Sequence, residues 1–82
     1  MTKDEIFNTL KNKMVETLEV EDPSTITLET SFRKDLGADS LDTYELIYAI
    51  ENDFNIQIED EQATQFNTVG DVVNFIAEEQ NK

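Results

Sequence analysis

Hydrophobic residues recur along this 82-residue chain at intervals of three and four, the spacing that places side chains on one face of an α-helix. In the first such segment, Thr2-Lys3-Asp4-Glu5 has the form of a capping box and predicts a helix that starts at Thr2. This helix is expected to end between Leu18 and Val20, because Pro23 cannot continue it. Its core face would consist of Ile6, Phe7, Leu10, Met14 and Leu18.

A second helix is predicted from about Ser40 to Phe54, with one buried face and one mixed face. The buried face would hold Thr43, Leu46, Ile47, Ile50 and Phe54. The mixed face beside it combines acids with large amphipathic side chains: Leu41, Tyr44, Glu45, Tyr48, Glu51 and Asn52. Because tyrosine is enriched at interfaces, this face indicates a docking surface; the alternative is that the tyrosines lean over the edge of the core.

The remaining segments complete a small helical fold. Residues 60–66 predict a short helix with Ala63 and Phe66 inside, after a connection that turns Ile56 and Ile58 inward. A last helix starts at Thr68 and buries Val69, Val72, Val73 and Ile76. The long connection 19–39 should be held to the core by Ile26, Leu28, Phe32 and Leu36, with a possible helical turn at 31–34. The pattern predicts an all-α bundle, in one domain over residues 1–82.

The charge of the chain limits which partners this bundle can bind. The net charge is −13, and residues 35–81 contain no Lys or Arg at all. Such a surface repels nucleic acid and attracts basic partner surfaces, although solubility alone would also explain it. We expect a monomer that binds no nucleic acid.

The sequence contains no cysteine and no histidine, which removes thiolate nucleophiles, zinc sites of the usual kind and an imidazole general base. An independent enzyme is therefore not expected, and we predict no catalytic residue and no metal site. No apolar run approaches the roughly 20 residues that a membrane span needs, and no signal-peptide core is present. A cytoplasmic protein without a membrane span is the expectation.

Ser40 is the candidate functional residue. A serine before an apolar-periodic run is an ordinary helix N-cap. The same position suits a phosphate ester, because free backbone N–H groups and the helix dipole stabilise an anion there. A catalytic role would need a nearby base, and the closest lysine is Lys34 in the preceding connection. The residues by themselves leave the first two interpretations open.

A resemblance bears on this choice. The stretch Leu36-Gly37-Ala38-Asp39-Ser40-Leu41-Asp42-Thr43, followed by Glu45-Leu46 and Ala49-Ile50-Glu51, resembles the 4′-phosphopantetheine attachment site of bacterial acyl carrier proteins of fatty acid synthesis. The resemblance extends over nearly the whole chain, through Ser31-Phe32, residues 58–63 and Thr68-Val69. It implies a four-helix bundle with three longer helices, a short third helix and a long first loop.

The resemblance also implies a function and a set of site residues. A phosphopantetheinyl transferase would move 4′-phosphopantetheine from coenzyme A to Ser40, with Asp39 beside it, and acyl chains would travel as thioesters between fatty acid synthesis enzymes. Those enzymes would present basic patches to the matching positions, which together with the tyrosines give a docking set of Leu41, Asp42, Tyr44, Glu45, Tyr48 and Glu51. An acyl cavity, or alternatively a plain core, would be lined by Phe32, Thr43, Leu46, Ile50, Ile58, Ala63, Phe66 and Val72.

Several positions depart from the family pattern, and other functions remain open. The departures are Tyr44, Tyr48, Asn52, Glu59 and Phe66. The first three alter the docking face, and Phe66 would narrow the cavity and favour shorter chains. The alternatives are a carrier for polyketide, peptidyl or D-alanyl transfer, and a non-covalent acidic module that occupies basic proteins.

Overall fold

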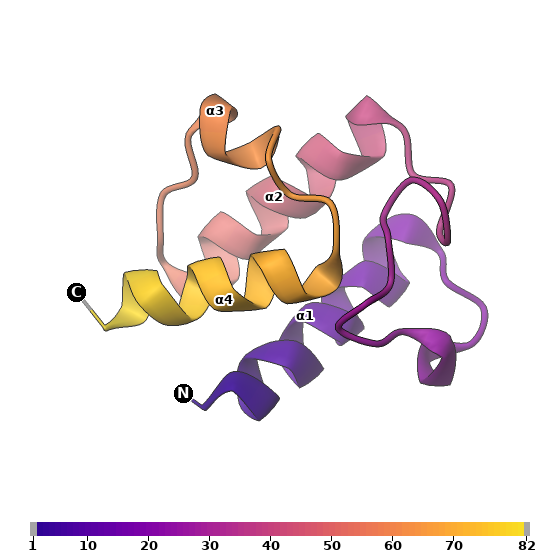
Figure 1. The fold of residues 1–82 in the computed structure, drawn as a ribbon, viewed down its shortest axis with the longest axis horizontal. Coiled ribbons are helices and arrows are strands. Elements are labelled where there is room, and N and C mark those ends of the chain that lie inside the picture. The colour runs from indigo at the N-terminus through magenta and orange to yellow at the C-terminus, as the bar shows by residue number, and fades with distance from the viewer. Residues whose placement is uncertain (1, 82) are drawn as a thin grey trace.

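The computed structural model describes residues 2–81, except for the side chain of Ser40. Four α-helices follow one another along the chain: α1 (Lys3–Leu18), α2 (Ser40–Phe54), α3 (Asp60–Ala63) and α4 (Val69–Gln80) (Figure 1). A 3₁₀ turn, η1 (Pro23–Thr25), lies in the long connection between α1 and α2. Over these residues the sole β feature is an isolated bridge between Ser31 and Thr68. The predicted all-α fold, with three longer helices, a short third one and a long first loop, is confirmed.

Reciprocal capping boxes start the three longer helices. At α1, Thr2 Oγ1 accepts from the backbone N–H of Glu5 at 3.2 Å, and Glu5 Oε1 accepts from the backbone N–H of Thr2 at 3.1 Å. At α4, Thr68 and Asp71 exchange the same pair of bonds at 3.3 and 3.2 Å. Each box satisfies two N–H groups that a helix start leaves without partners. Both of these predicted starts are confirmed.

The start of α2 differs from the simplest interpretation of its sequence. Asp39, not Ser40, is the N-cap, because its extended backbone lets its carboxylate accept from the N–H of Asp42 at 2.9 Å. Asp42 Oδ2 in turn accepts from the N–H of Asp39 at 3.4 Å. Ser40 is therefore the first helical residue, and the N-cap position belongs to Asp39.

The third helix is shorter than the sequence predicted, with four residues in place of seven. After Ala63 the backbone bonds close over three residues: Gln65 N–H donates to Gln62 O, and Phe66 N–H donates to Ala63 O. The hydroxyl of Thr64 also donates to the carbonyl of Glu61 at 2.8 Å. These bonds tighten the last turn and direct the chain toward α4.

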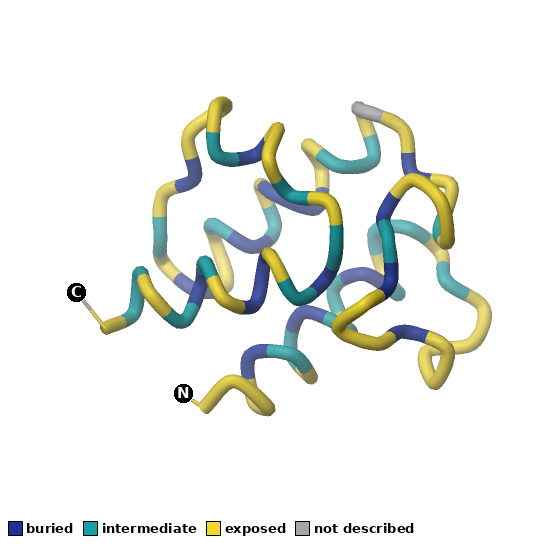
Figure 2. Tube along the Cα trace, viewed as in Figure 1, coloured by how far each residue is buried: buried dark blue, intermediate teal, exposed yellow. Residues whose placement is uncertain are grey.

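The core lies where α1 packs against both α2 and α4 (Figure 2). Each of the three long helices contributes one buried face, and the predicted face of α4 is confirmed in full. On α2, Thr43 is half-buried while the four larger residues of its predicted face are buried. The fully or nearly fully buried side chains include Ile6, Leu10, Met14, Leu46, Ile50, Val69, Val73 and Ile76.

Backbone hydrogen bonds attach the long connection to the start of α4. Gly70 N–H donates to Leu28 O at 2.8 Å, and Val69 N–H donates to Thr30 O at 3.0 Å. A Cβ on Gly70 would lie 2.9 Å from Leu28 O, so this close approach requires glycine. The side chain of Leu28 is 50% exposed. The prediction that it anchors the loop was wrong, because the anchor is its carbonyl group.

Candidate functional site: the first turn of α2 and the adjacent pocket

The backbone holds residue 40 in a defined turn. Gly37 adopts a left-handed conformation with φ of +64°, and Ala38 N–H then donates to Phe32 O at 2.9 Å. Beyond the Asp39–Asp42 box, the hydroxyl of Thr43 donates to Asp39 O at 3.0 Å. The neighbours of residue 40 face solvent, with Asp39 exposed and Leu41 67% exposed. Residue 40 thus lies between two exposed neighbours in a turn that hydrogen bonds fix.

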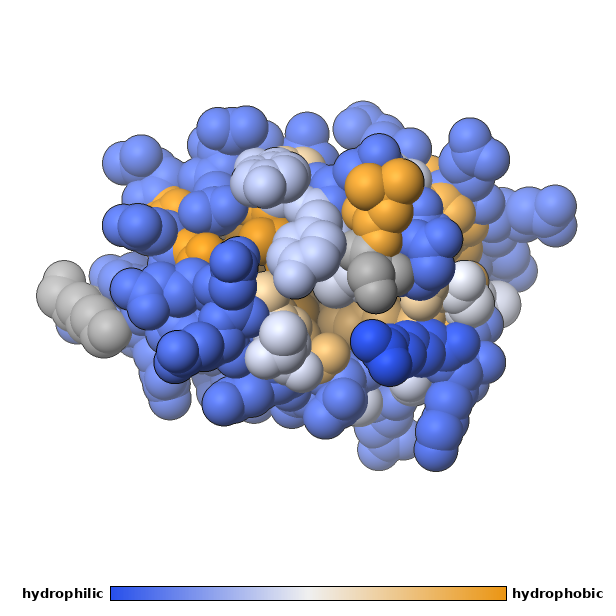
Figure 3. Space-filling view, turned by 90° about the horizontal axis from the view of Figure 1, so that it is seen from above, coloured by the Kyte–Doolittle hydropathy of each residue, from blue (hydrophilic) through white to orange (hydrophobic). Residues whose placement is uncertain are grey.

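The predicted docking face of α2 is exposed along most of its length. Leu41, Tyr44 and Tyr48 expose 67%, 39% and 65% of their surface, and Glu45 is exposed between them. Tyr48 faces solvent, whereas Tyr44 lies at the edge of a pocket. Figure 3 looks onto the top of the molecule as drawn in Figure 1, where hydrophilic residues surround small hydrophobic patches and a central hollow. Exposed tyrosines are enriched at interfaces, so this exposure supports the docking face, which stays a prediction.

Glu51 and Asp42 differ from the exposed Glu45, because both are half-buried and both accept a hydrogen bond from a backbone N–H. Glu51 Oε2 accepts from the backbone N–H of Ile58 at 3.1 Å. Its backbone carbonyl also accepts from Ile56 N–H at 3.3 Å. Glu51 therefore holds the connection between α2 and α3 in place, a structural role that the sequence did not reveal.

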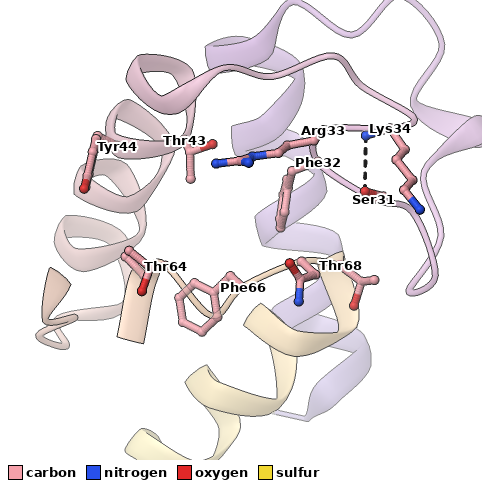
Figure 4. A pocket seen from close by; sticks show the side chains of 11 residues that line it. Ser31, Phe32, Arg33, Lys34, Thr43, Tyr44, Thr64, Phe66 and Thr68 are labelled. Atoms are coloured by element: carbon pink, nitrogen blue, oxygen red, sulfur yellow. Dashed lines mark hydrogen bonds between the residues drawn. The ribbon is translucent and has the colours of Figure 1, made fainter. Parts of the chain in front are cut away.

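A pocket of about 460 Å³ opens beside the first turns of α2. Three segments form it: residues 31–34, Thr43 and Tyr44 on α2, and residues 63–68 without 65. Figure 4 shows Phe32 and Phe66 extending into it from opposite sides, and Arg33 reaching across it toward Thr43. Phe66 also makes an edge-to-face contact with Phe75 of α4, with ring centroids 5.4 Å apart.

The structure brings half of the predicted acyl cavity to this pocket. Phe32, Thr43, Ala63 and Phe66 line it. The other predicted positions, Leu46, Ile50, Ile58 and Val72, are buried in the core. Sequence reasoning missed Arg33, Asn67 and the hydroxyl side chains of Ser31, Thr64 and Thr68. Hydrophobic periodicity could not predict these residues, because they come together only through tertiary structure. The bond from Phe32 N–H to Asn67 O joins two segments that are far apart in the sequence.

The salt bridges observed between described residues lie away from this site. Lys13 on α1 pairs with Asp53 on α2 at 3.1 Å and with Glu16 at 3.7 Å. Asp53, followed by Glu16, raises the pKa of Lys13 above its ordinary value. Of the helices in the described range, none is long and apolar enough to cross a membrane.

Comparison with known proteins gives one consistent result. Residues 8–76 match the family model described as the phosphopantetheine attachment site. The acyl carrier protein of Treponema pallidum (strain Nichols) is 58% identical over 73 residues, which cover 89% of this chain and 92% of the relative. The acyl carrier protein of Treponema denticola is 49% identical over 77 residues, which cover 94% of this chain and 97% of the relative.

Proposed function

This chain belongs to the acyl carrier protein family, whose members carry a phosphopantetheine attachment site, and from that premise we propose that Ser40 is the residue that takes the arm. A chain of this family is a carrier and not an enzyme. Its prosthetic group is 4′-phosphopantetheine. When attached, that group supplies the thiol that a sequence without cysteine lacks.

The other two serines support the choice of Ser40. The hydroxyl of Ser24 donates to Asp22 Oδ1 at 2.6 Å, and Ser31 Oγ accepts from the backbone N–H of Lys34 at 3.2 Å. Both side chains therefore stabilise loop turns. Residue 40 instead begins a helix between exposed neighbours, and the N-cap of that helix is Asp39. This position at a helix start is the single observation that carries the proposal.

The pocket has the chemistry that the arm requires. Phosphopantetheine consists of a phosphate, a gem-dimethyl group with a hydroxyl, two amide groups and a terminal thiol that carries the acyl chain. Arg33 offers a cation, Asn67 and Thr64 offer polar side chains, and Phe32 and Phe66 offer apolar walls. The residues present therefore fit the group.

Attachment transfers the phosphopantetheinyl group from coenzyme A to the serine oxygen. The Ser40 oxygen forms the ester bond to phosphorus while the pyrophosphate bond of coenzyme A breaks and adenosine 3′,5′-bisphosphate leaves. The hydroxyl proton goes to a base of the transferase, because this chain has no histidine to accept it.

Intact-mass measurement tests the attachment site. The purified protein is incubated with coenzyme A and a phosphopantetheinyl transferase of broad specificity. We expect one added arm on the wild type and on Ser31→Ala, and none on Ser40→Ala. An unmodified wild type, or a modified Ser40→Ala variant, would refute the proposal.

We propose further that the carrier serves fatty acid synthesis enzymes through the exposed face of α2. Acids that attract a basic patch accelerate encounter, while Leu41 and Tyr48 provide contact area after encounter. With a malonyl transferase of fatty acid synthesis as partner, Glu45→Gln should reduce the association rate and its salt dependence. Tyr48→Ala should raise the dissociation rate. Glu16→Gln on α1 is the matched control for charge and should change neither.

The same malonyl transferase separates this function from the alternatives. A carrier of fatty acid synthesis is loaded with malonyl groups on its arm. A carrier for polyketide, peptidyl or D-alanyl transfer would be a poor substrate. A non-covalent acidic module would bind basic proteins equally well after Ser40→Ala. We propose a single monomeric domain, because a net charge of −13 opposes self-association and the binding of nucleic acid.

A further inference from the structure

Arg33 is an unpaired cation at the mouth of the pocket. It is exposed, and its side chain reaches across the pocket toward Thr43 (Figure 4). Among the residues described, the salt bridges belong to Lys13, and no hydrogen bond or ion pair involves the guanidinium group of Arg33. The chain has six basic and 19 acidic residues, so carboxylates are plentiful. A guanidinium group that pairs with none of them is available for an external anion.

The pocket adjoins the turn that carries residue 40. Thr43 and Tyr44 follow residue 40 by three and four positions, so they are its neighbours along the helix surface, and both line the pocket. A phosphate esterified to Ser40 is one bond away from the serine oxygen. It would therefore lie close to the first turn of α2, the region toward which Arg33 extends.

We propose that Arg33 binds the phosphodiester of the prosthetic arm and so holds the arm against this pocket. The inference rests on the proposed attachment at Ser40. Guanidinium and phosphate form short, charge-assisted hydrogen bonds in a bidentate geometry. Arg33 also offsets the repulsion between the phosphate and the carboxylates of Asp39 and Asp42, which flank the attachment position. When Arg33 holds the phosphate, the rest of the arm lies against the polar and apolar residues that line the pocket.

Lys34 offers a matched control. It carries the same charge on the next residue and also lines the pocket, but its side chain lies on the side away from Thr43 and Tyr44 (Figure 4). Its backbone N–H donates to Ser31 Oγ, a bond that substitution of the side chain leaves intact. Arg33→Gln and Lys34→Gln therefore change the net charge equally while they affect the pocket mouth differently.

Phosphorus NMR of the arm-bearing protein tests the proposal. Intact mass first establishes that each variant carries one arm at Ser40, so a failure of attachment is recognised separately. We expect the phosphorus resonance of wild type and Lys34→Gln to move as NaCl is raised, because salt screens the contact with Arg33. In Arg33→Gln most of that movement should be lost, with the low-salt resonance already at the high-salt position.

The side-chain Nε–H resonance of Arg33 identifies the anion. It should shift between the protein without the arm and the protein with the arm. Equal phosphorus resonances in wild type and Arg33→Gln at low salt would overturn the proposal. A shift of the Arg33 resonance that appears only after malonyl loading would also overturn it, because the bound anion would then be the carboxylate of the acyl group.

Discussion

Glu51 holds two segments of the molecule together with one carboxylate. Its Oε2 accepts from the N–H of Ile58, whose side chain is buried, and α3 begins two residues later. α3 is a helix of four residues, too short to be stable without such supports. An acid that a docking partner could reach is thus also part of the attachment of α3.

Replacing Glu51 by alanine should loosen this region. The N–H of Ile58 would lose its acceptor while partly buried, which costs about 1 kcal/mol in free energy of unfolding. Urea unfolding measures this loss, and hydrogen exchange at the Ile58 amide should become faster. Glu45→Ala removes the same charge from an exposed position of α2 and should cause neither change. Equal behaviour of the two variants would contradict the structural role of Glu51.

Glu5 provides a second prediction for a single residue, based on pH. Hydrogen bonds from the backbone N–H and then the hydroxyl of Thr2 lower the pKa of Glu5 below its ordinary value of 4.5. A lowered pKa in the folded state means that the contribution of Glu5 to stability is complete above 4.5 and is lost as the pH falls through the lowered value. The free energy of unfolding should therefore differ between wild type and Glu5→Gln near neutral pH.

This difference should stay constant near neutral pH and shrink as the pH falls from 4.5 through the lowered pKa of Glu5, as its carboxylate becomes protonated. Chemical denaturation at several pH values measures it. Asp4→Asn is the control, because it removes a charge from the same helical turn without breaking the capping box. A difference between wild type and Glu5→Gln that stays constant with pH would contradict the prediction.

At the scale of elements, the N-termini of the helices are better stabilised than their C-termini. Three begin with reciprocal capping boxes. α1 and α2 both end on a residue in the left-handed conformation, Glu19 with φ of 55° and Asn55 with φ of 54°. Asparagine tolerates this conformation, but glutamate adopts it at a cost in energy. Glu19 also places a negative charge at the negative end of the helix dipole.

Glu19→Gly should therefore stabilise the protein by about 1 kcal/mol, because glycine adopts the left-handed conformation without strain. The measurement is the urea midpoint and the free energy of unfolding. Glu21→Gly is the matched control: it removes the same charge from the same connection, at a residue without a positive φ. It should be neutral or destabilising. A stabilisation equal to that of Glu19→Gly would show that charge, rather than backbone strain, is responsible.

At the scale of the whole molecule, like charge opposes the compact state. The net charge is −13 in a chain whose core is small for its surface. The cations between residues 3 and 34 offset little of this, and the Lys13–Asp53 pair is the salt bridge that joins α1 to α2. Stability should therefore depend strongly on the ions in solution.

Added salt should raise the melting temperature by screening this repulsion, since the Debye length falls from about 10 Å at 0.1 M to about 3 Å at 1 M. Millimolar Mg²⁺ should have the same direction of effect. Within the described residues, no three acids are grouped to hold a metal ion, and the effect expected of Mg²⁺ is the neutralisation of charge. Calorimetry across both titrations measures it, and unchanged melting curves would contradict it.

Local sequence was sufficient to predict the three longer helices and the family, whereas the attachment at Ser40 stays a proposal. The starts at Thr2 and Thr68, the buried face of α4 and the exposed stripe of Leu41, Tyr44 and Tyr48 follow from spacing and capping residues that act within a few positions. The motif around Ser40 indicated the family for the same reason, because its residues are contiguous.

Tertiary structure alone decided the features that depend on distant segments. The pocket forms because Phe32 N–H bonds to Asn67 O and Gly70 N–H bonds to Leu28 O, which brings residues 31–34 against residues 63–68. The orientation of Arg33 and the bond from Ile58 to Glu51 arise in the same way. Hydrophobic periodicity reports which face of an element is buried, but it carries no information about which loop lies opposite that face.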